Sequence, residues 1–226
     1  MDMKRLVLMF DLDGTLLDTN GLILASFRHT FAKYMPEKEL AEEELLTFLG
    51  PPLRDSFARY FEKQQLDEII DYYRIFNHDK HEKYVTVYPT VPETLKYYKD
   101  QGCPMAVVTT KPNFAAQMGL DMFGLTPYFD LLIGLDKVTE TKPDPEGILK
   151  CMQHFGTTDG IMIGDSPADI MAGKNAGVYT AGVEWTFKPV ELLTALSPDV
   201  MLREMKDLIP FVEKLGYSTL SKVNRI

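Results

Sequence analysis

Residues 6–16, LVLMFDLDGTL, decide the fold class, because an apolar run ends there in Asp11 and Asp13, two carboxylates separated by one residue. An aspartate that ends a buried parallel strand points into the crevice where open α/β sheets bind ligands. Carboxylates in such a crevice can hold Mg²⁺ and attack phosphorus. The stretch therefore predicts a strand followed by a reactive acidic site.

A hairpin turn at Asp13-Gly14 is the alternative interpretation of this stretch. The residues that follow do not support a second strand. Between 21 and 34 the apolar positions have helical spacing, namely Ile23, Phe27, Phe31 and Tyr34. The pattern favours a strand, a loop and a helix.

Composition bounds the class of protein. The chain has 226 residues, a net charge of −9 and a pI near 5.0, which allows one domain or one domain with a sizeable insert. Nucleic acids and anionic membranes need basic faces, so neither is an expected partner. An acidic protein that handles phosphate must concentrate positive charge locally, through a metal ion and a few Lys or Arg residues.

Cellular location follows from the cysteines and from the apolar runs. Cys103 and Cys151 stand alone, without zinc-site spacing, and are expected to be reduced core residues. The apolar run before Asp11 is too short for a signal peptide, and no stretch approaches the length of a membrane span. We expect a cytoplasmic protein.

Two kinds of sequence pattern alternate along the chain. Residues 19–83 predict helix after helix, with candidates at 22–34, 38–48, 54–63 and 67–83. After Pro89 short apolar strands alternate with helices that each end at a glycine, as a left-handed C-cap requires. The strands are expected at 105–109, 131–134, 161–164 and 178–183, with an edge strand at 200–202 and a last helix at 205–215. This alternation predicts a parallel sheet covered on both faces, interrupted by a helical insert.

Four segments in order carry a resemblance to a known family. They are Asp11 to Thr15, Val107 to Lys111, Lys142-Pro143, and Gly164 to Asp169. On these segments the chain resembles the haloacid dehalogenase-like phosphohydrolases, most closely their phosphoglycolate phosphatase-like branch, from Lys4 to about Leu215. The resemblance implies a doubly wound parallel sheet, a Rossmann-like core at 1–18 and 84–226, with a small helical cap at 19–83.

The resemblance also implies the roles of the acidic residues. Asp11 would be the nucleophile that forms an aspartyl-phosphate, and Asp13 the general acid and base. Asp165 would complete a Mg²⁺ site with the Asp11 carboxylate and the backbone carbonyl of Asp13. Asp169 has a second interpretation, because Ser166-Pro167-Ala168-Asp169 is typical of a capped helix start, so we expect it beside the ligands rather than among them.

Polar and basic residues would bind the transferring phosphoryl group. The resemblance assigns Thr109 and Thr110 to its oxygens, and Lys111 is a further candidate for substrate contact. Lys142 would shield Asp11 from the phosphate that it attacks and hold the carboxylate ionised. After Lys142, we expect Asp144 to be a helix N-cap and Pro145 to stand in the first turn.

The cap would close over the site about hinges at 17–20 and 85–89 and choose the substrate. Arg54, after Gly50-Pro51-Pro52, lies where family members reach into the site, although a solvated helix start is the equal alternative. The branch often carries a glycine-rich turn after its fifth strand, whereas residues 183–188 lack glycine. The resemblance therefore does not name phosphoglycolate as the substrate.

The function that the resemblance implies is a Mg²⁺-dependent phosphatase acting on a small soluble phosphate monoester, a phosphorylated metabolite. A sugar phosphomutase of the same superfamily stays open, as do pyrophosphate and nucleoside monophosphates as substrates. A non-enzymatic phosphate-binding module is disfavoured, because Asp11 and Asp13 are both present. Phosphate-loop and dinucleotide-binding motifs are absent from the sequence. Monomer and homodimer both stay open.

Overall fold

The computed structural model describes residues 5–217, so the ends of the predicted core at 1–4 and 218–226 lie outside the described residues. The chain divides into two compact units. The helical unit is Leu17–Thr86, and the core unit combines Met1–Leu16 with Val87–Ile226.

The core unit is built on a six-stranded sheet in the order β5-β4-β1-β6-β7-β8. All neighbouring strands in it are parallel. In that order, the strands are Leu131–Ile133, Met105–Val108, Leu6–Phe10, Asp159–Gly164, Tyr179–Val183 and Val200–Leu202. The predicted parallel sheet is confirmed, with β8 at its edge.

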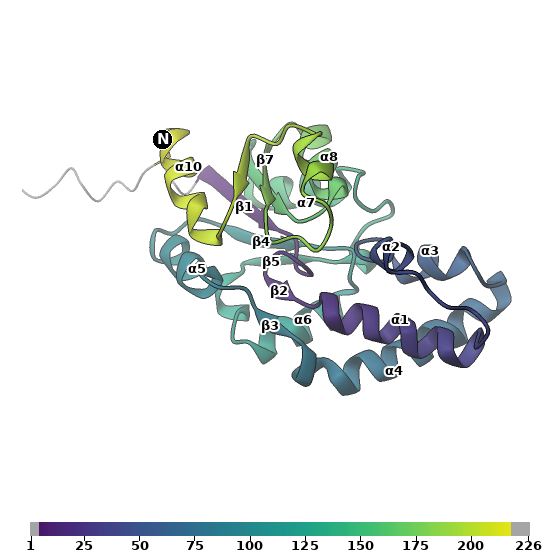
Figure 1. Ribbon diagram of the computed structural model, residues 1–226. Coiled ribbons are helices and arrows are strands. Elements are labelled where there is room, and N and C mark those ends of the chain that lie inside the picture. The colour runs from purple at the N-terminus through teal and green to yellow at the C-terminus, as the bar shows by residue number, and fades with distance from the viewer. Residues whose placement is uncertain (1–4, 218–226) are drawn as a thin grey trace, which may run out of the picture. The chain divides into compact units, whose positions relative to one another are not determined.

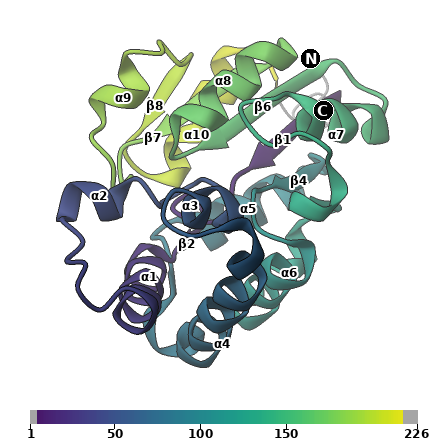
Figure 2. The same ribbon diagram turned by 90° about the vertical axis from the view of Figure 1, so that its right-hand side faces the viewer.

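Helices cover both faces of this sheet, which explains why its central strands are apolar without alternation. Every residue of β1 and β4 is buried. Figures 1 and 2 show α7 (Glu146–Phe155) and α8 (Pro167–Ala176) on one side, and α5 (Val91–Asp100) and α6 (Asn113–Met122) on the other. Successive strand side chains point to opposite faces. One face of the core joins residues of β1, β4 and β6 to α7 and α8, including Val7, Met9, Ala106, Val108, Met162, Ile148, Cys151 and Ala172.

The predicted glycine stops are confirmed. Gly156 follows α7 and Gly177 follows α8, with φ angles of 61° and 73°. An L side chain adopts this left-handed conformation only at a cost, so glycine is favoured at both positions.

The remaining helices of the core unit are short. It contains α9 (Glu191–Thr194) and α10 (Leu208–Lys214), with 3-10 turns at Thr126–Tyr128, Leu135–Lys137 and Met205–Asp207. The single helix predicted at 205–215 is therefore a 3-10 turn followed by α10. Within residues 5–217, no helix has the length and apolar composition needed to cross a membrane.

The helical unit has an aromatic core of its own. Its helices are α1 (Asn20–Tyr34), α2 (Glu42–Leu46), α3 (Leu53–Ala58) and α4 (Leu66–Tyr84), and α1 and α4 lie side by side (Figure 1). Phe27 stacks on Phe48 with ring centroids 4.3 Å apart, and packs against Phe57 and Tyr73. These residues belong to a buried cluster that joins all four helices.

Two predicted helices are shorter than expected. The helix predicted at 38–48 begins only at Glu42, because Ala41 before it is extended. The helix predicted at 54–63 ends at Ala58, and Glu62 is extended and caps a separate 3-10 turn, Lys63–Gln65. Strands β2 (Leu17–Asp18) and β3 (Thr86–Val87), which pair in a second sheet, were not predicted. Two residues are too few to show an alternating pattern.

Candidate active site

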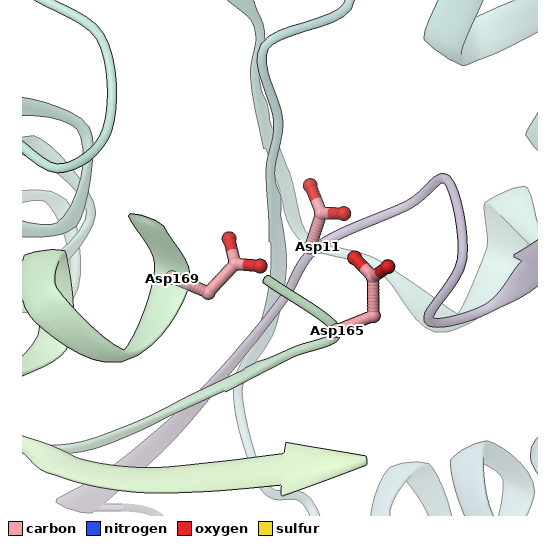
Figure 3. Close-up of side chains that lie close together, drawn as sticks. All are labelled: Asp11, Asp165 and Asp169. Atoms are coloured by element: carbon pink, nitrogen blue, oxygen red, sulfur yellow. The ribbon is translucent and has the colours of Figure 1, made fainter. Parts of the chain in front are cut away.

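Three carboxylates meet at the carboxyl edge of the central strands. Asp11 directly follows β1, Asp165 directly follows the neighbouring strand β6, and Asp169 lies in the first turn of α8. One oxygen from each lies within 4.8 Å of the others. Figure 3 shows the three carboxyl groups gathered in one place. The exposed fractions are 7% for Asp11, 4% for Asp165 and 1% for Asp169, so water does little to balance their charges.

Lys142 links two of these carboxylates. Its Nζ donates to Asp11 Oδ1 at 2.8 Å, to Asp169 Oδ1 at 2.6 Å and to the Val108 carbonyl at 2.9 Å. An ammonium group has three donors, so all three are used. Burial lowers the pKa of Lys142, but the charges of Asp11 and Asp169 outweigh it and raise the pKa above its usual value. Lys142 is therefore held as a cation against Asp11.

The helix after Lys142 has its N-cap one residue later than the sequence predicted. Helix α7 begins at Glu146 with Pro145 at the N-cap position. The expectation that Asp144 is the N-cap is thus wrong. Its carboxylate still accepts a hydrogen bond from the Glu146 N–H at 2.9 Å, so it satisfies a donor of the first turn from one position further back.

Burial dominates the acidity of the two strand-end aspartates. It raises the pKa of Asp11 to about 7, with Lys142 lowering that pKa and Asp169 and Asp165 raising it. Burial also raises the pKa of Asp165 to about 6, against the lowering effect of Lys188. Buried carboxylates of this kind suit a hard divalent cation, which prefers oxygen ligands and would balance their charge. The donor set therefore fits a hard divalent cation such as Mg²⁺.

Asp169 is occupied by contacts that position it. Its Oδ2 accepts from the Ser166 N–H at 3.0 Å and from the Ser166 hydroxyl at 2.6 Å, while Oδ1 accepts from Lys142. The Asp169 N–H in turn donates to the Ser166 hydroxyl, which completes the capping box expected from the sequence. Ser166 and Lys142 thus engage both oxygens of the Asp169 carboxylate.

Asp13 and Lys111 form a second ion pair. Lys111 Nζ donates to Asp13 Oδ1 at 2.8 Å, and both side chains are largely buried. Next to Asp13, Gly14 has a φ of 85°, and a Cβ built there would lie 2.6 Å from Asp165 Oδ2. The loop after β1 thus passes directly against Asp165, and only glycine allows that approach.

Thr109 and Thr110 follow β4, the other neighbour of β1. The buried Thr109 donates its N–H to the Ile133 carbonyl at 3.0 Å, and its hydroxyl accepts from the Lys111 N–H at 3.2 Å. Thr110 is half-buried. Parallel strands end at one edge of the sheet, so β4 brings both residues to the edge that carries Asp11.

Arg54 lies in the helical unit, at the start of α3. Its guanidinium forms an ion pair with Asp67 of α4, and both side chains are mostly exposed. This contact lies wholly within the helical unit. Contact between Arg54 and a substrate stays a prediction.

Two residues of this site were not predicted. The Thr186 hydroxyl donates to the Asp165 carbonyl at 2.9 Å, and Lys188 Nζ lies 3.5 Å from Asp165 Oδ2. Both follow β7, the parallel neighbour of β6, so their loop leaves the sheet at the edge where the aspartates lie. Their proximity to Asp165 depends on the order of the strands, which no local sequence pattern carries. In the sequence, this loop is distinguished only by its lack of glycine.

Comparison with known proteins agrees with this geometry. The family model described as haloacid dehalogenase-like hydrolase matches residues 8–183. The chain belongs to the haloacid dehalogenase-like hydrolases. It is therefore an enzyme of the hydrolase class, and the resemblance drawn from the four segments is confirmed at the family level.

Among relatives in this family, the protein named pyrophosphatase PpaX from Bacillus velezensis is 45% identical over 210 residues, covering 92% of this chain and 96% of the relative. The protein of the same name from Bacillus cereus strain AH820 is 41% identical over 218 residues, covering 96% and 100%. The structure of a predicted phosphatase from Clostridium acetobutylicum has a TM-score of 0.81 at 28% identity, covering 93% and 99%. A haloacid dehalogenase-like hydrolase from Streptococcus pneumoniae has a TM-score of 0.80 at 25% identity, covering 92% and 98%.

Proposed function

We propose that the protein hydrolyses small phosphate monoesters through an aspartyl-phosphate on Asp11, with Mg²⁺ as its cofactor. The observation that carries the proposal is the pairing of Asp11 with Lys142 at 2.8 Å, beside the buried Asp165. A nucleophilic carboxylate must approach a phosphoryl group that is itself negative. The Lys142 ammonium lowers that repulsion and favours the ionised form of Asp11.

The reaction would run in two steps on the residues of this chain. An Asp11 oxygen forms a bond to phosphorus while the bond from phosphorus to the leaving oxygen breaks, and Asp13 donates its proton to that oxygen. The Asp13 carboxylate then takes a proton from water, whose oxygen attacks phosphorus and breaks the bond to Asp11. The Lys111 ion pair is expected to orient the ionised Asp13 for the second transfer, in which it takes the proton from water.

The metal would be held by the carboxylates of Asp11 and Asp165 and by the backbone carbonyl of Asp13. When bound, Mg²⁺ would neutralise phosphoryl charge and help to align the reacting groups. Thr109 and Thr110 are proposed to bind phosphoryl oxygens. Asp169 is proposed as a residue that positions Lys142, which its two engaged oxygens support.

We further propose that the insert at 19–83 is a cap that selects the substrate. The insert carries none of the residues proposed for the chemical steps. Substitutions in it can therefore alter substrate selection without disturbing the nucleophile. The proposed location is the cytoplasm, which the two buried free thiols support. Monomer and homodimer stay open.

A second candidate function is inorganic pyrophosphatase activity. The observation that favours it is the name pyrophosphatase carried by relatives that are 45% and 41% identical over almost their whole length. Hydrolysis of pyrophosphate would use the same nucleophile, and its leaving group would be phosphate rather than an alcohol.

Phosphate release tests both candidates. The purified protein is assayed with Mg²⁺ against pyrophosphate, phosphoglycolate, sugar phosphates, nucleoside monophosphates and a generic aryl phosphate. Turnover of one or several monoesters well above pyrophosphate supports the first candidate, and the reverse order supports the second. Absence of release from every compound, with a folded and Mg²⁺-loaded protein, would contradict both.

A further inference from the structure

Lys188 is a buried cation that the proposed reaction does not use. Its Nζ lies 3.5 Å from Asp165 Oδ2, and the two side chains are only 11% and 5% exposed. Opposite charges that are this close and shielded from water interact strongly. Lys188 therefore affects Asp165 far more than a surface lysine would.

The loop after β7 holds Lys188 in this position. The Thr186 hydroxyl donates to the Asp165 carbonyl at 2.9 Å and accepts from the Lys188 N–H at 3.1 Å. These two hydrogen bonds tie the backbone of Lys188 to that of Asp165 in a short relay. The approach of the ammonium thus depends on the loop as well as on a flexible side chain.

The two buried lysines of the acidic cluster have different partners. Lys142 contacts Asp11 and Asp169. Lys188 contacts Asp165, and among the described residues it is the cation that forms an ion pair with this carboxylate. In the function proposed above, Asp165 is also a ligand of the divalent cation. An ammonium and a divalent cation that share one carboxylate repel each other and compete for its oxygens.

We propose that Lys188 weakens the affinity of the site for its divalent cation, and so sets the cation concentration at which the enzyme is loaded. This inference rests on the metal-dependent function proposed above. It predicts that removal of Lys188 strengthens metal binding. Loss of a lysine that merely supported the site would leave Asp165 less ordered and weaken metal binding, whereas loss of a competing charge tightens it.

The test is calorimetric titration of Mg²⁺ into the full-length protein without substrate. Lys188→Met keeps much of the side-chain length and removes the charge, and is expected to bind Mg²⁺ roughly five-fold or more tightly than the parent. Lys188→Arg keeps the charge and is expected to stay within about two-fold of the parent. At one subsaturating Mg²⁺ concentration, the rise in melting temperature should also be larger for Lys188→Met than for the parent.

Lys96→Met is the matched control. It changes the net charge by the same amount on the exposed surface of α5, where Lys96 pairs with Asp100. If Lys96→Met tightens binding as much as Lys188→Met, the effect belongs to net charge and the inference is overturned. Unchanged or weaker binding in Lys188→Met overturns the inference alone. A parent protein that binds no divalent cation overturns the metal-dependent function as well.

Discussion

At the scale of single residues, the site depends on how Lys142 is held. Its three donors reach Asp11, Asp169 and the Val108 carbonyl, and Asp169 is in turn fixed by Ser166. Each partner comes from a different strand end or helix start. Several chain segments therefore determine the orientation of Asp11, the one residue that is proposed to carry out the attack.

Replacing that aspartate gives the sharpest prediction at this scale. Asp11→Asn should lower phosphate release by on the order of 10³-fold or more, because an amide forms no acyl-phosphate and is a poor metal ligand. The protein should stay folded, since the amide matches the carboxylate in size. Steady-state phosphate release and far-UV circular dichroism check the two parts.

The matched control is Asp100→Asn, which makes the same chemical change on the exposed end of α5. It should retain the parent rate within about two-fold, as exposed substitutions usually do. Substantial turnover by Asp11→Asn would rule out Asp11 as the nucleophile.

At the scale of elements, the turn from β6 into α8 brings Asp165 and Asp169 into one cluster. Ser166 caps the helix and Pro167 occupies its first turn, so the chain turns within a few residues of the strand end. Gly164 makes this possible. A Cβ built on Gly164 would overlap the Asp169 carboxyl group. The requirement for glycine here comes from close approach rather than from a left-handed backbone.

Gly164→Ala should therefore destabilise the protein and impair the site together. Forcing a methyl group into a packed region costs about 1–3 kcal/mol of unfolding free energy. The displaced Asp169 would also release Lys142, so phosphate release should fall by more than the unfolded fraction explains. Urea denaturation and kinetics at a temperature where the variant is folded separate the two effects.

Gly21→Ala is the contrasting substitution. Gly21 lies in α1 with open space around its Cβ position. Alanine there should be neutral or stabilise the protein by up to about 1 kcal/mol through its helix propensity. An equal loss of stability in both variants would show that crowding at Asp169 is not the cause.

At the scale of the whole molecule, the sequence best predicted the residues that directly follow an apolar run. Asp11, Thr109 and Asp165 each follow a buried strand of the parallel sheet, so their placement at one edge follows from fold class. Helix ends at glycine followed from backbone sterics in the same way.

Other features depend on tertiary contacts that no local pattern carries. Lys188 lies five residues beyond β7 in a loop without periodicity, and its contact with Asp165 depends on the order of the strands. The early end of α3 depends on the extended Glu62, which caps the next turn. Tertiary packing determines strand order and caps of this kind. Local sequence patterns therefore do not predict them.

Metal removal should affect the molecule as a whole. EDTA is expected to abolish phosphate release and Mg²⁺ to restore it, while Ca²⁺ should oppose Mg²⁺ because of its higher coordination number and looser geometry. Saturating Mg²⁺ should also raise the melting temperature, since a ligand at 100 times its dissociation constant stabilises the folded state by about 2.7 kcal/mol. Full activity after exhaustive chelation would contradict the proposed cofactor.

The two cysteine thiols provide a separate test of how well the packed core unit shields its interior from solvent. Burial raises the pKa of Cys103 and of Cys151 to about 12. A raised pKa means less thiolate at any given pH, and at pH 8 the native fraction is only about 10⁻⁴, against roughly a quarter for an ordinary thiol. Because the thiolate is the reactive form, both cysteines should resist alkylation in the native protein and react promptly in denaturant. Timed labelling with iodoacetamide at pH 8, followed by mass spectrometry, measures this directly. Native labelling at the rate of a free thiol would show that α7 opens readily if Cys151 reacts, and that the loop between α5 and β4 opens if Cys103 reacts. Only the first result would require revision of the packed core between the sheet and α7.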